Sequence, residues 1–275
     1  MQQIIAVVVD EPGRGDRDHA LISGLAGHLA AAGLGLGAAY TLPGFTAGAP
    51  WRDLLDPAAA GLLPDPADSP VAFGHVLAGQ PLRGSRTELT DLVAAAPELA
   101  AAVERELPAV AAAGRADYAA AVRRGVPLDH SRRTAEFVLW QISALESGAE
   151  PLPRELAGIA VALRDRAVRD VMFALAAGPH AAAAERLWLL LTRALTGADR
   201  AEAAALLGYS AYLRGDGPFA GIAFDIALDA LPEHSMAVLL EASLRAGIRP
   251  ARLRRLVACG YESATDLGLN LGPRP

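Results

Sequence analysis

The pattern of apolar and polar positions predicts a short β-α-β unit at the start of the chain. Residues 4–9 form a continuous apolar run of mostly branched side chains, which is typical of a strand buried on both faces. Apolar residues at helical spacing follow over residues 21–29, and Gly33 is a suitable helix end. Residues 36–42 then resemble a second strand, which we expect to lie parallel to the first because a helix connects them.

Two strands leave this sheet incomplete, because each edge exposes unpaired backbone groups and the helix has little surface on which to pack. Either further strands come from segments that resemble loops, or a preceding segment or a partner completes the sheet. Residues 43–69 are the main such segment, since they are rich in proline and glycine and contain Trp51 and Arg52. Loops of this length are often binding loops or missed elements.

Beyond this segment the pattern predicts helices. Residues 71–77 are a short helix candidate, and Ser85-Arg86-Thr87-Glu88 has the spacing of a capping box before Leu89. After Pro97, proline repeatedly stands at expected helix starts and glycine at expected helix ends. The expected helices are residues 98–113, with a continuation through 118–124 left open, 131–146, 153–176, 181–195, 200–214, 218–230, 235–246 and 250–258.

We therefore expect a mostly helical protein in two parts. The first is an α/β unit over residues 1–96 with a long loop rich in proline and glycine, and the second is an all-α bundle over residues 97–275. The composition agrees, because 52% of the residues are hydrophobic and only 5% are aromatic. Such a core is built from closely approaching helices with small side chains.

Residues 201–232 form a helical hairpin that resembles one tetratricopeptide repeat. The matching positions are Leu207-Gly208, Gly215-Asp216, Ala220, Phe224, Ala227-Leu228 and Pro232. Gly208 and Ala220 would let the two helices approach closely, and Gly215 would turn the chain. The repeat's first aromatic position is Ala204, and no second copy follows at the expected period. Since a lone repeat cannot bury its own apolar face, we interpret the hairpin as packing rather than as a peptide-binding array.

Short segments over most of the chain carry a family resemblance. They are Asp16-Arg17-Asp18, Trp51 with Leu54 and Leu55, Pro64-Asp65-Pro66 with Ser69-Pro70-Val71, Arg83-Gly84-Ser85-Arg86 before Leu89, Ala162-Leu163-Arg164-Asp165 with Val168-Arg169-Asp170, and Arg214-Gly215-Asp216-Gly217 with Leu228 and Pro232. Together they resemble an actinobacterial family known as domain of unknown function 4192. The resemblance implies no activity. It does imply a further apolar segment before the first strand, which this sequence lacks.

Charge and cysteine content narrow the functional classes. A net charge of −6 argues against a sequence-independent grip on nucleic acid, which needs a clustered positive surface. All 25 basic side chains are arginine, which the codon bias of a G+C-rich genome explains. The single cysteine, Cys259, excludes an intramolecular disulfide and a cysteine-rich zinc site, and it suits a reducing compartment. We expect a cytoplasmic protein.

Neither a membrane segment nor a targeting signal is expected. Residues 24–45 carry no Asp, Glu, Lys or Arg, but several glycines and Pro43 interrupt them, which is unsuitable for a spanning helix. Asp10 and Glu11 follow the first apolar run almost at once, which argues against a secretory signal peptide.

The sequence contains no complete catalytic or metal-binding set. Gly13-Arg14-Gly15 has the order of a dinucleotide fingerprint, but Asp18 stands where the third glycine belongs, and nearby acids would repel a pyrophosphate. Gly-x-Ser-x-Gly and phosphate-loop motifs are absent, and the six histidines show no metal-ligand spacing. We expect no cofactor and no metal, and we lean away from an enzyme.

Six residues are candidates for ligand binding: Trp51, Arg52, Arg83, Arg86, Arg164 and Arg169. Trp51 and Arg52 either line a pocket at the strand ends, where ligands of open α/β sheets bind, or pin the loop to the core. Arg164 and Arg169 alternate with acidic residues, and Asp165–Arg169 and Arg166–Asp170 are i,i+4 pairs. This stretch is either a salt-bridge face or, with Arg83 and Arg86, a grip for an anion.

Three functional hypotheses follow. The leading one is a protein-interaction or scaffold protein, with a protein partner or a homo-oligomer. The alternative is a small-molecule sensor or an enzyme that holds an anionic ligand at the junction near Trp51, Arg83 and Arg86. The third is a helical bundle that serves as a self-association surface.

Overall fold

The structure is a computed structural model that describes residues 3–9, 15–77 and 86–274. Contacts within the chain divide it into two compact units, residues 1–84 and residues 85–275. We call them the N-terminal unit and the helical unit and describe each by itself.

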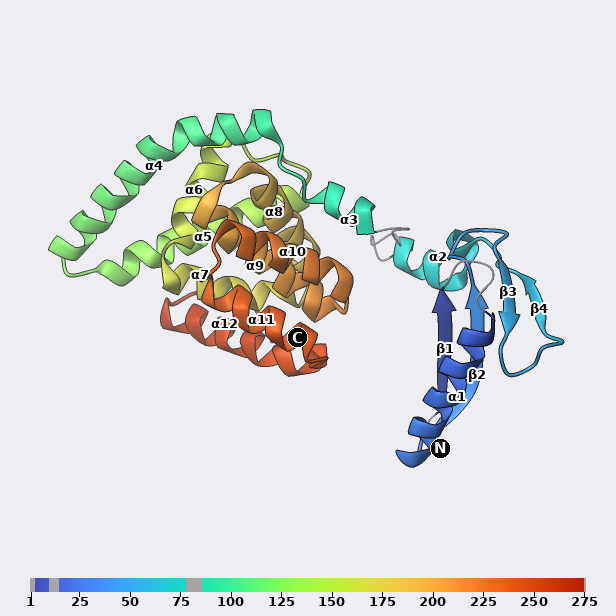
Figure 1. Cartoon of the computed structure of the whole chain (residues 1–275). Helices are drawn as coiled ribbons and strands as arrows, with labels where there is room; N and C mark the ends of the chain where they lie inside the picture. Colours follow the sequence, from blue (N-terminus) through green and yellow to red (C-terminus); the bar gives the residue numbers. More distant parts are fainter. Residues whose placement is uncertain (1–2, 10–14, 78–85, 275) are drawn as a thin grey trace. The chain divides into compact units, whose positions relative to one another are not determined.

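The N-terminal unit contains an open four-stranded sheet (Figure 1). Its elements are β1 (Gln3–Val9), α1 (Gly15–Ala31), β2 (Gly35–Leu42), β3 (Pro50–Asp53), β4 (Ala60–Leu62), the 3-10 helix η1 (Pro66–Asp68) and α2 (Pro70–Leu77). The strand order is β1-β2-β3-β4; β1 and β2 are parallel, and β3 is antiparallel to both of its neighbours. The expected β-α-β unit and the short helix after it are confirmed.

Residues 43–69, the segment that resembled a loop, supply two further strands of the sheet, β3 and β4. β3 begins at Pro50, which suits the first residue of a strand because proline has no N–H to donate. Trp51 of β3 meets Tyr40 of β2 edge to face, with ring centroids 5.6 Å apart. Sequence patterns missed β3 and β4 because they are only 4 and 3 residues long. Strands of this length depend on their partners more than on periodicity.

β1 is covered on one face only, so the expectation of a strand buried on both faces is wrong for the chain as described. Ile22 of α1 is buried with Ala39 and Leu54 on one side of the sheet. On the other side, Ile5 is 67% and Val7 is 46% exposed. A single connecting helix can cover only one face of a sheet.

The helical unit consists of α3 to α12 with two short 3-10 helices (Figure 1). Its elements are α3 (Arg86–Leu92), α4 (Pro97–Arg123), α5 (Pro127–Glu146), α6 (Pro153–Leu163), α7 (Arg166–Met172), η2 (Phe173–Ala176), α8 (Ala181–Ala194), α9 (Gly197–Arg214), α10 (Gly217–Ala230), α11 (Ser235–Arg245), η3 (Pro250–Leu253) and α12 (Arg254–Asp266). Leu89 and Leu92 of α3 pack on the core of this unit. The domain boundary expected between residues 96 and 97 stays a prediction.

Two helical segments differ from the expected pattern. α4 is one continuous helix that includes Pro108, and it curves in Figure 1, as helices do where proline removes a backbone hydrogen bond. Residues 153–176, expected as one helix, divide into α6, α7 and η2. Asp165 makes the break, because its Oδ1 accepts a hydrogen bond of 2.9 Å from the N–H of Ala167 and so caps α7.

The expected hairpin is formed by α9 and α10. A Cβ at Gly208 would collide with the ring of Phe224, and Ala220 is fully buried, so the close approach of the two helices is confirmed. Gly215 turns the chain with a φ of +96°, a conformation that favours glycine. The resemblance of this hairpin to a tetratricopeptide repeat stays a prediction.

Candidate functional site

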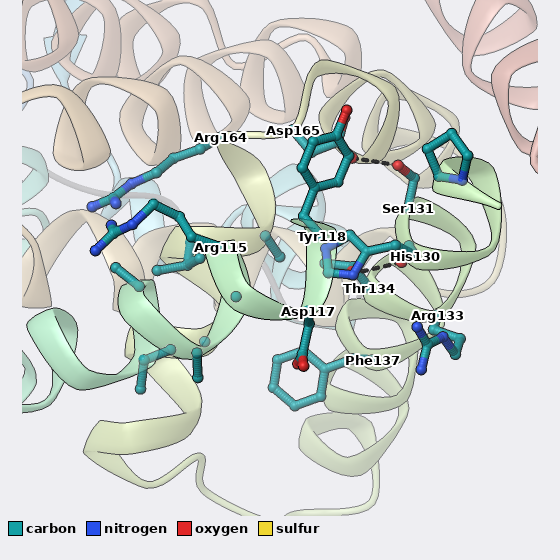
Figure 2. Close-up of a pocket in the computed structure, with 18 of the residues that line it drawn as sticks. Arg115, Asp117, Tyr118, His130, Ser131, Arg133, Thr134, Phe137, Arg164 and Asp165 are labelled. Carbon is teal, nitrogen blue, oxygen red and sulfur yellow. Dashed lines mark hydrogen bonds between the residues drawn. The ribbon is translucent and has the colours of Figure 1, made fainter. Parts of the chain in front are cut away.

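A wide groove lies in the helical unit between α4, α5 and α6 (Figure 2). Its volume is about 1120 Å³. The groove exists because the second half of α4 contributes little to the core: every residue from 112 to 120 is at least partly exposed. Its lining residues are Val110, Ala111, Ala113, Gly114, Arg115, Asp117 and Tyr118 of α4, Pro127, Leu128, His130, Ser131, Arg133, Thr134 and Phe137 of α5, and Arg154, Glu155, Gly158, Val161, Ala162, Arg164, Asp165 and Arg166 of α6 and the start of α7.

The groove floor, by which we mean Gly114, Phe137, Gly158 and Val161, is apolar and depends on its two glycines. A Cβ at Gly158 would lie 3.1 Å from Cε1 of Phe137, and a Cβ at Gly114 would lie 3.3 Å from Cγ1 of Val161. Both distances are shorter than an ordinary carbon contact. A larger residue at either position would therefore force the neighbouring side chain to move.

One end of the groove is polar (Figure 2). Ser131 of α5 is buried and donates a hydrogen bond of 2.5 Å to Oδ2 of Asp165. Thr134 donates to the carbonyl oxygen of His130 at 2.8 Å. The rings of Tyr118 and His130 meet edge to face with centroids 5.6 Å apart. These contacts tie α4, α5 and the start of α7 together at this end.

Ser131, His130 and Asp165 are the residue types of a catalytic triad, but their arrangement is different. A nucleophilic serine donates its hydrogen bond to the histidine that removes its proton. Here Ser131 donates to the carboxylate of Asp165, which also accepts from the backbone N–H of Ala167. Asp165 therefore fixes the start of α7, and this geometry favours a structural role for the three residues.

Five arginines and three acidic residues line the groove. They are Arg115, Arg133, Arg154, Arg164 and Arg166, and Asp117, Glu155 and Asp165. In Figure 2, Arg115 and Arg164 point to one side of the groove and Arg133 lies on the other. Arg164 and Arg166 pair with Asp199 and Asp170, which lie outside the lining, so three arginines and three acidic residues of the lining remain. The suitability of the groove for an anionic ligand therefore depends on which of these arginines have no ionic partner.

These arginines differ in the hydrogen bonds and ion pairs that their side chains form. Nε and Nη2 of Arg164 donate to both carboxylate oxygens of Asp199, at 2.8 and 2.6 Å, and this hydrogen bonding raises the pKa of Arg164 above its ordinary value. Arg133 donates to the carbonyl oxygen of Asp129 at 3.2 Å. Within the part of the chain that the structure describes, the side chains of Arg115 and Arg154 form no hydrogen bond or ion pair.

Among the expected ligand-binding residues that the structure describes, Arg164 is the one that lines the groove. Arg169 instead hydrogen-bonds Asp170 at 2.8 Å and lies 3.8 Å from a carboxylate oxygen of Glu202 in α9. The expected pair of Arg166 with Asp170 forms at 3.7 Å. Asp165 was expected to pair with Arg169, but its carboxylate instead accepts hydrogen bonds from Ser131 and from the N–H of Ala167, because it caps α7.

The other expected residues lie elsewhere. Trp51 and Arg52 are in β3, where a Cβ at Gly61 would lie 2.9 Å from Cζ2 of Trp51. Trp51 thus packs directly on the neighbouring strand, which supports the interpretation that it pins this segment. Arg86 of α3 forms an exposed ion pair of 3.0 Å with Asp225 of α10. Arg83 lies outside the described residues, so a joint site of Trp51, Arg83 and Arg86 stays a prediction.

Sequence reasoning missed most of the groove, although one signal was present. Val110, Gly114 and Tyr118 recur every four residues and therefore lie on one side of a helix. The expected helix ended at residue 113 with its continuation left open, so this side of α4 was not identified. Arg115 and Arg154 had no recognisable motif around them.

Among residues 3–9, 15–77 and 86–274, no three His, Cys, Asp or Glu residues are grouped so that they could hold a metal ion. In the same ranges, no helix combines the length and the apolar character that crossing a membrane requires.

Comparison with known proteins identifies the family. The model of the family described as a domain of unknown function (DUF4192) matches residues 1–251, so the chain belongs to this family. The resemblance expected from the sequence is confirmed. Neither a search of the curated proteins nor a search of the solved structures finds a match.

Proposed function

We propose that this member of the DUF4192 family is a non-enzymatic binding protein that holds a segment of a partner protein in the groove between α4, α5 and α6. One observation carries the proposal: an open groove of about 1120 Å³ with an apolar floor and arginine side chains beside it. Pockets for small molecules typically measure about 300–1,000 Å³ and enclose most of the ligand. An open groove of larger size suits a length of polypeptide better.

Two further features support a binding role. The polar end of the groove uses Ser131 and Asp165 to fix the helices, which leaves no serine activated for nucleophilic attack there. Tyr118 is 49% and Leu128 is 63% exposed, so apolar surface is available for a partner. Cys259, the single cysteine, suits a reducing compartment, and we place the interaction in the cytoplasm.

The proposal can be tested with a peptide-display selection on the full chain. Ala113 and Ala112 are adjacent exposed residues of α4, but only Ala113 lines the groove. Ala113→Trp would fill part of the groove, whereas Ala112→Trp adds the same side chain outside it. We expect the selected peptides to bind the wild-type chain and Ala112→Trp alike and to lose affinity for Ala113→Trp.

Thermal unfolding of both variants controls for damage to the fold. Peptides that bind all three proteins equally would show that the groove is not the binding site and would overturn the proposal. If the partner is a second copy of the chain, light scattering will show an oligomer that Ala113→Trp dissociates and Ala112→Trp does not.

A further inference from the structure

We infer that the segment held in the groove is an amphipathic helix whose polar sides carry acidic residues. This inference rests on the proposed function, because it specifies the chemistry of the segment that the groove binds. It follows from the charge of the groove, from the state of its acidic residues and from its shape.

The first argument is that three arginines of the groove have no close ionic partner. Arg115 and Arg154 form no ion pair within the described chain, and Arg166, 84% exposed, has Asp170 only at 3.7 Å. Exposed ion pairs are weak on their own, but a docked partner excludes water and strengthens them. The guanidinium groups of these arginines in α4, α6 and α7 can therefore form ion pairs with carboxylates of a bound segment.

The acidic residues that line the groove repel an acidic segment less than their number suggests. Oε2 of Glu155 accepts the backbone N–H of Leu152 at 2.7 Å, and Asp165 accepts from Ser131 and from the N–H of Ala167. Both carboxylates lie at the first turn of a helix, where the positive end of the helix dipole partly offsets their charge. Asp117 is the remaining acidic residue of the lining.

The shape of the groove is the third argument. From Val110 to Tyr118, α4 borders the groove over eight residue steps, which is about 12 Å at the rise of an α-helix. A bound helix over the same length presents apolar residues at positions i, i+3 or i+4, and i+7 to the apolar floor. Positions that flank this apolar stripe face the arginines beside the floor, so an amphipathic acidic helix matches both features of the groove.

Synthetic peptides with a fluorescent label test this chemistry on the full chain. The probe has about twelve residues, or roughly three helical turns, with leucine at the apolar positions and glutamate elsewhere. A second peptide replaces each glutamate with glutamine. Fluorescence anisotropy should show that the glutamate peptide binds about tenfold more tightly than the glutamine peptide at low salt, and that added salt reduces this difference.

Two double variants with the same change in net charge test whether the glutamate peptide binds in the groove. Arg115→Glu with Arg154→Glu reverses two groove arginines, and Arg105→Glu with Arg186→Glu reverses two exposed arginines that lie outside the groove. Both double variants change the net charge equally. The groove variant should raise the Kd of the glutamate peptide about tenfold, while the control variant changes it by less than about twofold.

Different failures have different meanings. If the two peptides bind equally, or if both double variants act equally, the acidic chemistry is overturned. The proposed function still stands in that case if display-selected peptides distinguish Ala113→Trp from Ala112→Trp. If a single-stranded oligonucleotide binds more tightly than the glutamate peptide and loses its affinity for the groove variant, the groove binds nucleic acid and the inference is wrong. Unchanged thermal unfolding of the double variants ensures that lost binding is not lost folding.

Discussion

In the helical unit Trp188, Tyr209 and Phe224 are each at most 1% exposed, whereas the buried cluster of the N-terminal unit consists of Ile22, Ala39 and Leu54. The large aromatic side chains of the helical unit belong to one continuous core that extends from α3 to α12. Stability rises with the apolar area that a unit buries, so we expect the helical unit to be the more stable of the two. The candidate groove belongs to this more stable unit.

The glycines show the same difference in another way. Gly208 in α9 is a packing contact, because a Cβ there would collide with the ring of Phe224. Gly24 and Gly27 in α1 have no atom within 4 Å of the position that a Cβ would take. Gly208 therefore lets two helices approach closely, whereas Gly24 and Gly27 only lower the helix propensity of α1.

The largest expected effect comes from Trp188→Ala. Trp188 is 1% exposed in the main core, and truncating a buried tryptophan costs about 3–5 kcal/mol through lost burial and the cavity that remains. Urea unfolding followed by circular dichroism should show this loss of free energy in the transition of the helical unit. A loss below about 1 kcal/mol would mean that the core can collapse around the cavity, contrary to the continuous packing described here.

Ile22→Ala is the corresponding side-chain truncation in the N-terminal unit, and it should lower the free energy of unfolding by less than Trp188→Ala does. Ile22 is 4% exposed, but its cluster is small, so we expect about 2 kcal/mol, the low end for isoleucine truncation. Hydrogen exchange followed by mass spectrometry should show lost protection in α1 and β2 and unchanged protection in α8 and α9. Equal loss in both units would show that the two units unfold together, contrary to this prediction.

Sequence reasoning predicted elements that are determined by local patterns and missed those that depend on tertiary contacts. The first strand, the helix after it and the hairpin of α9 and α10 follow from periodicity and from glycine and proline positions, and all are confirmed. β3 and β4 were missed because they are short and are defined by pairing. The break at Asp165 was missed because capping of α7 competes there with an otherwise helical pattern.

The candidate site was harder to predict than the fold. The groove lies between α4, α5 and α6, which follow one another in the chain, but the space between them depends on how these helices pack, and its chemistry comes from single arginines without a motif. Arg164 was identified only because it belongs to a conspicuous run of alternating charges. Gly114 and Gly158 leave room for the side chains of the groove floor, but a glycine inside a helical pattern does not reveal which residue fills the space it leaves.

Gly208→Ala should lower the stability of the helical unit by an intermediate amount. The added methyl group must displace the fully buried ring of Phe224, and overpacking of this kind costs about 1–3 kcal/mol. Gly221→Ala in α10 is the matched control, because its Cβ would lie 3.7 Å from Leu244, an ordinary contact. Calorimetry should show a lower melting temperature for Gly208→Ala and an equal or higher one for the control. The reverse order would show that the two helices do not depend on Gly208.

The smallest expected effect is a gain in the N-terminal unit from Gly27→Ala. Gly27 lies inside α1 and is exposed, and the space that a Cβ would take there is empty. Replacing a helical glycine with alanine at such a position stabilises a helix by up to about 1 kcal/mol, because the unfolded chain loses conformational freedom. Hydrogen exchange should therefore show higher protection in α1, with the helical unit unchanged. The same substitution thus has opposite signs at Gly27, where the space is empty, and at Gly208, where the ring of Phe224 occupies it. A loss of protection in α1 would show that Gly27 packs against a neighbour, contrary to the empty space described here.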